Sequence, residues 1–211
     1  MFKPKKVLVL APHTDDGEFG CGGSVARFLE AGADVFSAAF SSCRQSVPGH
    51  LPEDILISEY KAANSALGVK KKNIFLFDYD VRNFPQSRQA ILEDLIRLKK
   101  DVSPDLIFMP SVNDIHQDHR VIAEEGLRAF KFATILCYEI PWNNLQFNST
   151  AFVPLEERHL NVKLKALSKY RSQEHRDYSD ASYIRSLARV RGVQIGRSFA
   201  EMFDVIRWVL K

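Results

Sequence analysis

The stretch KVLVLAPHTDDGEFGCGGSVARFLEAG, residues 6–32, carries most of the information about the fold. Its first part, Lys6–Pro12, is predicted to be a continuous buried strand, because it is apolar at nearly every position, as is typical of a strand covered on both faces of a sheet. Polar residues and several glycines follow, and SVARFLEAG (24–32) then has the pattern of a helix that stops at Gly32. A strand followed by a helix begins a βαβ unit, so this stretch predicts a parallel sheet.

The same alternation of strands and helices continues along the chain. The sequence predicts further strands at 34–40, 73–77, 106–109, 134–138 and 199–210, although the last segment also suits a helix. It predicts further helices at 54–67, 87–100, 159–172 and 180–191, another that ends at Phe130, and a loop at 141–154. The pattern therefore predicts an α/β fold with a mostly parallel central sheet and helices on both faces, in one domain spanning 1–211.

Composition places the chain among ordinary globular proteins. Of 211 residues, 45% are hydrophobic and 26% are charged, and the formal net charge of +3 is too even to indicate nucleic-acid binding. The apolar run near the N-terminus is too short for a signal peptide, and no stretch is long enough to span a membrane. The three cysteines match no metal-binding spacing, so we expect reduced thiols in a cytoplasmic protein.

Two polar clusters follow strands that we expect to be neighbours. HTDD (13–16) follows the first predicted strand, and HQDH (116–119) comes shortly after the strand at 106–109. Because ligands of an open parallel sheet bind outside the carboxyl ends of its strands, we expect the two clusters to meet at one edge. Together they supply six candidate residues: His13, Asp15, Asp16, His116, Asp118 and His119.

The residue types in these clusters suit a catalytic metal. Histidine and aspartate bind zinc and similar divalent ions, and a catalytic site keeps three protein ligands and an open position. Two histidines and one carboxylate would supply the three ligands. The remaining candidate residues can supply a general base and a group that stabilises the oxyanion. Each residue alone has a simpler explanation, such as a carboxylate near a helix N-terminus or a structural histidine. Their conjunction at two strand ends indicates a metal-dependent hydrolase, while the division between ligands and catalytic residues stays open.

The glycine-rich segment GEFGCGG (17–23) invites comparison with phosphate-binding loops. It lacks the GxGxxG spacing and the lysine of a P-loop, which disfavours phosphate binding. We expect instead a close approach of the backbone beside the metal loop, with Cys21 as a small packing residue.

The motifs APHTDDGEFGCGG and HQDH together resemble those of the PIG-L or LmbE-like family of N-acetyl sugar deacetylases, and the RSQ segment at 171–173 extends the resemblance. The resemblance implies a Rossmann-like α/β sandwich and metal-dependent hydrolysis of an N-acetyl amide. It implies metal ligands at His13, Asp16 and His119, with Asp15 as general base. It also implies that His116 stabilises the oxyanion and that Asp118 orients a neighbouring histidine.

Two positions depart from the family pattern. Thr14 replaces the usual proline, and Leu56 stands where relatives often carry an arginine that holds substrate. The ligands remain, so the departure at Leu56 concerns the identity of the substrate rather than the metal chemistry. The polar loop at 41–53 and the segment 141–144 are candidates for substrate contacts.

The predicted function is therefore deacetylation of an N-acetylglucosamine-type sugar or glycoconjugate. The predicted cofactor is Zn²⁺, with Fe²⁺ or another divalent ion as alternatives. We expect a small-molecule substrate, no nucleic-acid partner, no stable membrane insertion, and the possibility of a homo-oligomer. Hydrolysis of another amide or ester, a metal-dependent nucleotide-sugar transferase and a non-catalytic binding module are the competing functions.

Overall fold

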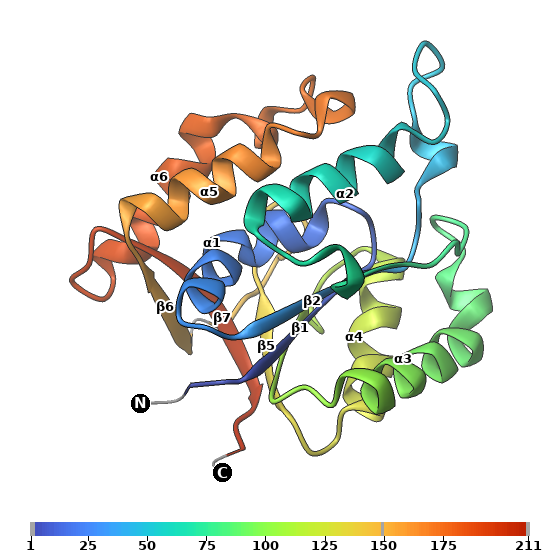
Figure 1. Ribbon diagram of the computed structural model, residues 1–211, viewed down its shortest axis with the longest axis horizontal. Coiled ribbons are helices and arrows are strands. Elements are labelled where there is room, and N and C mark those ends of the chain that lie inside the picture. Colours follow the sequence, from blue (N-terminus) through green and yellow to red (C-terminus); the bar gives the residue numbers. More distant parts are fainter. Residues whose placement is uncertain (1–2, 149, 210–211) are drawn as a thin grey trace.

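The computed structural model describes residues 3–148 and 150–209 and contains a seven-stranded sheet between two layers of helices (Figure 1). The strand order is β3-β2-β1-β4-β5-β7-β6. The strands are β1 (Lys6–Ala11), β2 (Asp34–Ala39), β3 (Ile74–Leu76), β4 (Leu106–Pro110), β5 (Thr134–Tyr138), β6 (Ala151–Leu155) and β7 (Phe199–Arg207). The first five are parallel, and β7 runs antiparallel to both β5 and β6. The predicted Rossmann-like, mostly parallel sheet is confirmed.

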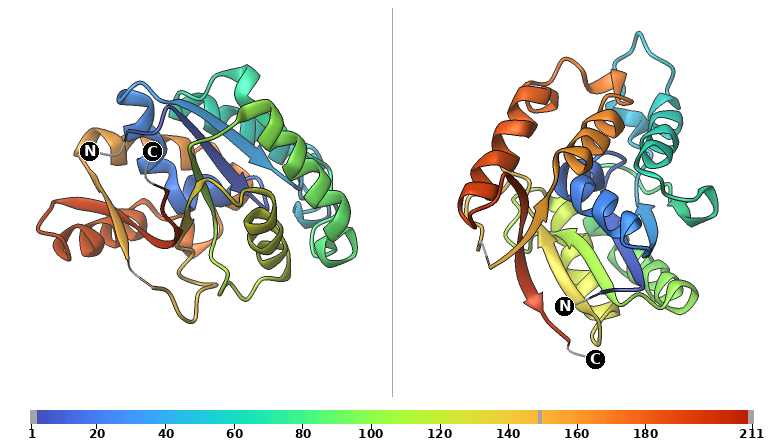
Figure 2. Two further views of the ribbon diagram at one scale, coloured as in Figure 1. Left: turned by 90° about the horizontal axis from the view of Figure 1, so that it is seen from below. Right: turned by 60° about the vertical axis from the view of Figure 1, so that its left-hand side comes forward.

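Helices cover both faces of this sheet, as predicted (Figures 1 and 2). One layer contains α1 (Asp16–Glu30), α2 (Ile55–Leu67), α5 (Glu157–Leu167) and α6 (Ala181–Val193), and the other contains α3 (Arg88–Val102) and α4 (Gln117–Ala129). Short 3₁₀ helices occur at Arg44–Ser46, Lys71–Asn73, Phe84–Ser87, Arg171–Gln173 and Asp177–Ser179. Among the described residues, no helix is long and apolar enough to cross a membrane.

Strand β1 shows why its sequence is continuously apolar. Val7 and Val9 pack into the core beneath α1, α2 and α5, whereas Leu8 and Leu10 face the core beneath α3 and α4. All four side chains are almost completely buried. Since successive side chains of a strand point to opposite faces, a strand covered on both sides requires apolar residues at every position.

The C-terminal part of the chain differs from the prediction in three places. The segment 141–154, predicted as a loop, contributes most of β6, which forms an edge of the sheet. The helix predicted at 159–172 begins at Glu157 and ends at Leu167. The strand predicted at 199–210 is present as Phe199–Arg207, and Leu210 lies outside the described residues.

Helix α1 begins at Asp16, so the prediction that it starts after the glycines was wrong. The helix is interrupted at Cys21, whose φ of −145° and ψ of 18° are not helical. Beyond this kink the amides of Gly23 and Ser24 donate to the Glu201 carboxylate on β7, at 2.9 and 2.7 Å. The glycines permit the close approach to the sheet, because a Cβ at Gly20 would lie 2.3 Å from the Tyr138 ring. The expected close approach of the backbone is present, and it is made to side chains of the sheet at Gly17, Gly20 and Gly23 and to Lys163 of α5 at Gly22.

Candidate metal centre and catalytic cavity

A cavity of about 320 Å³ lies at the carboxyl ends of β1 and β4. The two strands are hydrogen-bonded neighbours, so the loops that follow them meet at one edge of the sheet. Five of the six candidate residues line the cavity: His13, Asp15, Asp16, His116 and His119. Asp118 does not line it but contacts His13 from behind. The structure thus brings together the two clusters that are about a hundred residues apart in the sequence.

At the centre of the cluster, two histidine ring nitrogens and one aspartate oxygen form a triangle. His13 Nδ1 lies 3.2 Å from Asp16 Oδ2, His119 Nε2 lies 3.2 Å from the same oxygen, and the two nitrogens are 3.2 Å apart. The carboxylate is held in place by the backbone amide of His13, which donates to Asp16 Oδ2 at 2.8 Å.

Each histidine of the triangle has a carboxylate on its other nitrogen. His119 Nδ1 lies 2.7 Å from Asp114 Oδ2, and His13 Nε2 lies 3.1 Å from Asp118 Oδ2. When the two rings are neutral, these partners accept the protons on His119 Nδ1 and His13 Nε2, which leaves lone pairs on His119 Nε2 and His13 Nδ1, the two atoms that face Asp16. A carboxylate behind a histidine is the usual arrangement at metal-binding histidines.

The sequence analysis missed Asp114. Besides His119, this completely buried carboxylate accepts the backbone amide of His116 at 2.8 Å, so it positions both histidines of the second cluster. The only signal was a further carboxylate two residues before His116 in SVNDIHQDHR. Asp118 is held in a similar way, because its carboxylate accepts the amides of Arg82 at 2.6 Å and Phe84 at 3.3 Å.

His116 has a different environment from the other two histidines. It precedes α4, and its Nδ1 accepts the backbone amide of Asp118 at 3.2 Å. Burial and the neighbouring His119 and His13 lower the pKa of His116 to about 4. A neutral ring whose Nδ1 accepts a hydrogen bond carries its proton on Nε2. His116 is therefore a hydrogen-bond donor through Nε2.

The ionisable groups of the cluster perturb one another. Burial would raise the pKa of Asp16, but His119 and His13 hold that pKa well below its usual value. Burial would lower the pKa of His119, but Asp16 and Asp114 raise it to about 10. Burial and the charge of Asp16 raise the pKa of Asp15 to about 6, and a bound cation would lower it. The cluster thus places two carboxylates and two histidines close together, and a bound divalent cation would offset the negative charge of the carboxylates.

The triangle fits a small tetrahedral cation. Zinc–nitrogen and zinc–oxygen bonds of about 2.0–2.1 Å at tetrahedral angles separate ligand atoms by about 3.3 Å. The three separations of 3.2 Å are close to that value. Nitrogens of His13, His116 and His119 also lie within 4.8 Å of one another, a looser grouping.

Loops distant in sequence form the walls of the cavity. The loop at 41–53 contributes Cys43 and Ser46, and the segment 141–144 contributes Trp142 and Asn143, so both predicted loops reach the cavity. Gln173 of the RSQ segment lines it too. The remaining wall residues are Thr14, Phe19, Leu56, Val81, Arg82, Arg176 and Tyr178. Leu56 is almost completely buried, so it is an apolar part of the wall.

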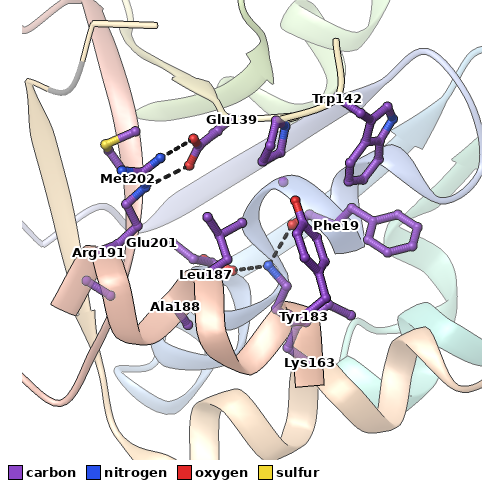
Figure 3. A pocket seen from close by; sticks show the side chains of 14 residues that line it. Phe19, Glu139, Trp142, Lys163, Tyr183, Leu187, Ala188, Arg191, Glu201 and Met202 are labelled. Atoms are coloured by element: carbon purple, nitrogen blue, oxygen red, sulfur yellow. Dashed lines mark hydrogen bonds and ion pairs between the residues drawn. The ribbon is translucent and has the colours of Figure 1, made fainter. Parts of the chain in front are cut away.

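A second cavity of about 30 Å³ lies beside the first and shares Phe19 and Trp142 with it (Figure 3). Its charged side chains are paired. Lys163 Nζ lies 2.6 Å from Glu201 Oε1, and Arg191 Nη2 lies 2.5 Å from Glu139 Oε1. Lys163 also donates to the carbonyl of Phe19.

The chain thus has a Rossmann-like sheet with a histidine–carboxylate cluster at the carboxyl ends of two adjacent strands, β1 and β4. The chain belongs to the PIG-L family, because the model of GlcNAc-PI de-N-acetylase matches residues 8–130. It is similar to the uncharacterized deacetylase YaiS of Escherichia coli (strain K12), with 30% identity over 81% of this chain and 92% of that protein. It is also similar to diacetylchitobiose deacetylase of Thermococcus kodakarensis, with 27% identity over 93% of this chain and 81% of that protein.

A solved structure extends the similarity to the fold. N,N'-diacetylchitobiose deacetylase from Pyrococcus horikoshii, in complex with an inhibitor, superimposes with a TM-score of 0.79 at 25% identity. The match covers 96% of this chain and 84% of that one. The chain is thus an enzyme of the deacetylase type, as the resemblance of its motifs indicates.

Proposed function

We propose that this protein is a metal-dependent hydrolase that removes the N-acetyl group from an N-acetylglucosamine-type sugar or glycoconjugate. A zinc ion, or another divalent ion such as Fe²⁺, is held by His13, Asp16 and His119. The observation that carries the proposal is the triangle of lone-pair atoms 3.2 Å apart, with Asp114 and Asp118 behind its two histidines.

His116 is the competing third ligand, and its hydrogen bond argues against that role. Its Nδ1 is occupied by the amide of Asp118, and its Nε2 carries the proton of the neutral ring. Ligation through Nε2 would require a change of tautomer and the loss of this hydrogen bond at the start of α4. Asp16 needs no such change, because its carboxylate already faces both other ligands.

Two further residues of the cavity, Asp15 and His116, carry out the proton transfers. When bound, the ion would act as a Lewis acid that activates water and polarises the amide carbonyl. Asp15 takes a proton from the attacking water, as a carboxylate in the cavity wall. His116 donates its Nε2 proton in a hydrogen bond to the carbonyl oxygen as negative charge develops there. The leaving amine receives a proton from Asp15 or from His116.

The names of the relatives support an acetylated sugar as substrate, since they are deacetylases and one acts on diacetylchitobiose. The competing transferase function would need a site for a diphosphate. The glycine-rich segment offers none, because the amides of Gly23 and Ser24 already donate to Glu201. The three cysteines are free thiols, which is consistent with the proposed cytoplasmic location.

The test is an assay of acetate release from a panel of N-acetylated sugars and glycoconjugates, with and without a chelator. We expect at least one member to release acetate, the chelator to stop the reaction, and added Zn²⁺ or Fe²⁺ to restore it. Hydrolysis of other amides or esters without any acetate release from the sugars would contradict the proposed substrate. Full activity in a protein proven free of metal would contradict the proposed mechanism.

A further inference from the structure

One wall of the catalytic cavity comes from the segment 170–178, which lies between α5 and α6 and is called the 170–178 wall below. Three of its side chains, those of Gln173, Arg176 and Tyr178, line the cavity. The segment contains no strand and no α-helix, so contacts with other parts of the chain must determine where it lies.

The 170–178 wall is attached to α2 through the carboxylate of Glu59. This carboxylate accepts the backbone amide of Ser172 at 3.1 Å and the hydroxyl of the same residue at 2.6 Å. Both side chains are buried. Two hydrogen bonds from one residue, one from its backbone and one from its side chain, fix the orientation of the wall as well as its distance from α2.

Glu59 is not part of the cavity lining, but it lies close to a residue that is. It follows Leu56 by three positions on α2, so the two side chains project from the same face of the helix. Leu56 lines the cavity directly. One face of α2 therefore contributes to the cavity and also holds the opposite end of the 170–178 wall in place.

A chain of contacts leads from Ser172 to the side chains at the cavity. The Ser172 hydroxyl oxygen accepts Nε2 of Gln173 at 3.2 Å, and the side-chain carbonyl of Gln173 accepts Nε of Arg176 at 3.1 Å. The guanidinium carbon of Arg176 lies 5.8 Å from the centre of the Tyr178 ring, within the range of a cation–π contact. Tyr178 in turn stacks on Trp142, with ring centres 4.1 Å apart and an interplanar angle of 11°. The chain of contacts thus connects α2 to four side chains of the cavity lining.

A second contact attaches the beginning of the wall to the catalytic loop. The buried hydroxyl of Tyr170 donates to the backbone carbonyl of Thr14, the residue between His13 and Asp15. The 170–178 wall is therefore attached at one point to the loop that carries the metal ligands and at another to Glu59 of α2.

We propose that Glu59 is a positioning residue of the catalytic reaction. Through Ser172 it holds the 170–178 wall at the distance from the metal cluster that a bound substrate requires. Because a misplacement of about 1 Å can cost about 10²-fold in rate, a small displacement of this wall is enough to impair the reaction without unfolding the protein. The inference rests on the proposed deacetylation, since it concerns the cavity in which that reaction takes place.

The test is the variant Glu59→Gln, assayed with the best substrate of the N-acetylated panel. Glutamine keeps the size of the side chain, but its amide nitrogen cannot accept a hydrogen bond, so one of the two bonds from Ser172 is lost. We expect KM to rise about tenfold, with kcat within about threefold of the native value and metal content unchanged. Ser172→Ala should raise KM by a similar factor, and the double variant should be little worse than either single variant, because both changes break the same contact.

The matched control is Asp94→Asn on α3. Asp94 is 6% exposed, as Glu59 is, and its carboxylate accepts the hydroxyl of Tyr79 outside the cavity lining. Both variants should lose stability to urea, but at a temperature where both are folded only Glu59→Gln should have a raised KM. An unchanged KM in Glu59→Gln, or an equal rise in Asp94→Asn, would overturn the proposal.

The fluorescence of Trp142 reports the position of the wall without any substrate. Its ring stacks on Tyr178, and replacing the only other tryptophan by Trp208→Phe leaves Trp142 as the single emitter. In this background Glu59→Gln should raise the acrylamide quenching constant of Trp142, and Asp94→Asn should leave it unchanged. Failure of the whole panel to release acetate would contradict the proposed function, and quenching would then decide the inference by itself. A raised constant would support the positioning by Glu59, and an unchanged constant would refute it.

Discussion

The two neighbouring cavities share part of their walls but differ in how the charged side chains that line them are paired. Phe19 and Trp142 belong to both linings. In the smaller cavity each cation has a carboxylate: Lys163 pairs with Glu201, and Arg191 pairs with Glu139 (Figure 3). In the larger one, two histidine nitrogens and a carboxylate oxygen lie 3.2 Å from one another, and two arginines of its wall form no ion pair with a carboxylate of the described residues.

This difference distinguishes buried charges that stabilise the fold from charged groups that are available to bind a ligand. Glu201 receives Lys163 and the amides of Gly23 and Ser24, so its charge is satisfied within the protein and it fixes the kink of α1. Satisfied polar groups specify a structure and offer little to a ligand. Around Asp16, by contrast, three potential metal-ligand atoms face one another at the wall of an open cavity.

The largest expected effect is that of His119→Ala, which removes one corner of the triangle. We expect metal affinity to fall by more than about 100-fold, beyond the range for loss of a residue that only supports a ligand. Turnover should fall below detection. Metal analysis of the purified variant and acetate release measure the two effects. His50→Ala, at an exposed loop histidine, is the control, and full metal content in His119→Ala would refute the ligand assignment.

The change Asp15→Asn should separate catalysis from metal binding within the same cavity. Asparagine keeps the shape of the side chain but cannot accept the water proton, so kcat should fall by about 10²–10⁴-fold. Metal content should stay close to that of the native protein, because Asp15 is not part of the triangle. Measured kcat together with metal analysis tests this, and an unchanged kcat would eliminate Asp15 as the base.

Asp114→Asn should have a smaller effect, because this residue acts through His119. Loss of the negative charge behind a ligating histidine typically costs 10–100-fold in metal affinity or activity. The diagnostic measurement is the chelator concentration that removes half of the metal, which should be lower than for the native protein. An unchanged metal affinity with unchanged turnover would show that Asp114 only stabilises the loop before α4.

The sequence was sufficient for the sheet and the two clusters because both depend on local patterns. Apolar runs alternating with helical periodicity identified six of the seven strands: the five parallel strands β1 to β5, and the antiparallel strand β7. HTDD and HQDH stood out because their residues follow strand ends, and the structure places them together around one cavity.

The sequence was insufficient where a structural role depends on distant partners. Strand β6 has five residues, one of them a proline, and it exists because β7 pairs with it. Helix α1 could not be predicted to run through its glycines, because the carboxylate that satisfies its kink comes from Glu201, 178 positions after Gly23. Arg82 and Arg176 carry no motif, and only the folded chain places them at one cavity.

The smallest effect on turnover is expected for Lys163→Met, in the smaller cavity, where Lys163 forms an ion pair with Glu201. Lys163 and Glu201 have side chains that are only 7% exposed, and removing one partner of a buried pair typically costs about 3–5 kcal/mol in the free energy of unfolding. Since Glu201 keeps two backbone amides, we expect a loss near 3 kcal/mol, seen as a urea midpoint lower by about 1 M. At low temperature, where the variant is folded, kcat and metal content should remain within about twofold of native values.

The double variant Lys163→Met with Glu201→Gln completes this test. Glutamine can still accept an amide of α1 but leaves no buried charge without a counterion, so part of the lost stability should return. Recovery of stability without change in kcat would show that the Lys163–Glu201 pair of the smaller cavity stabilises the fold and takes no part in catalysis in the larger cavity. A large fall in kcat of the folded Lys163→Met variant would contradict that division, because it would show that the pair beneath Phe19 also supports catalysis.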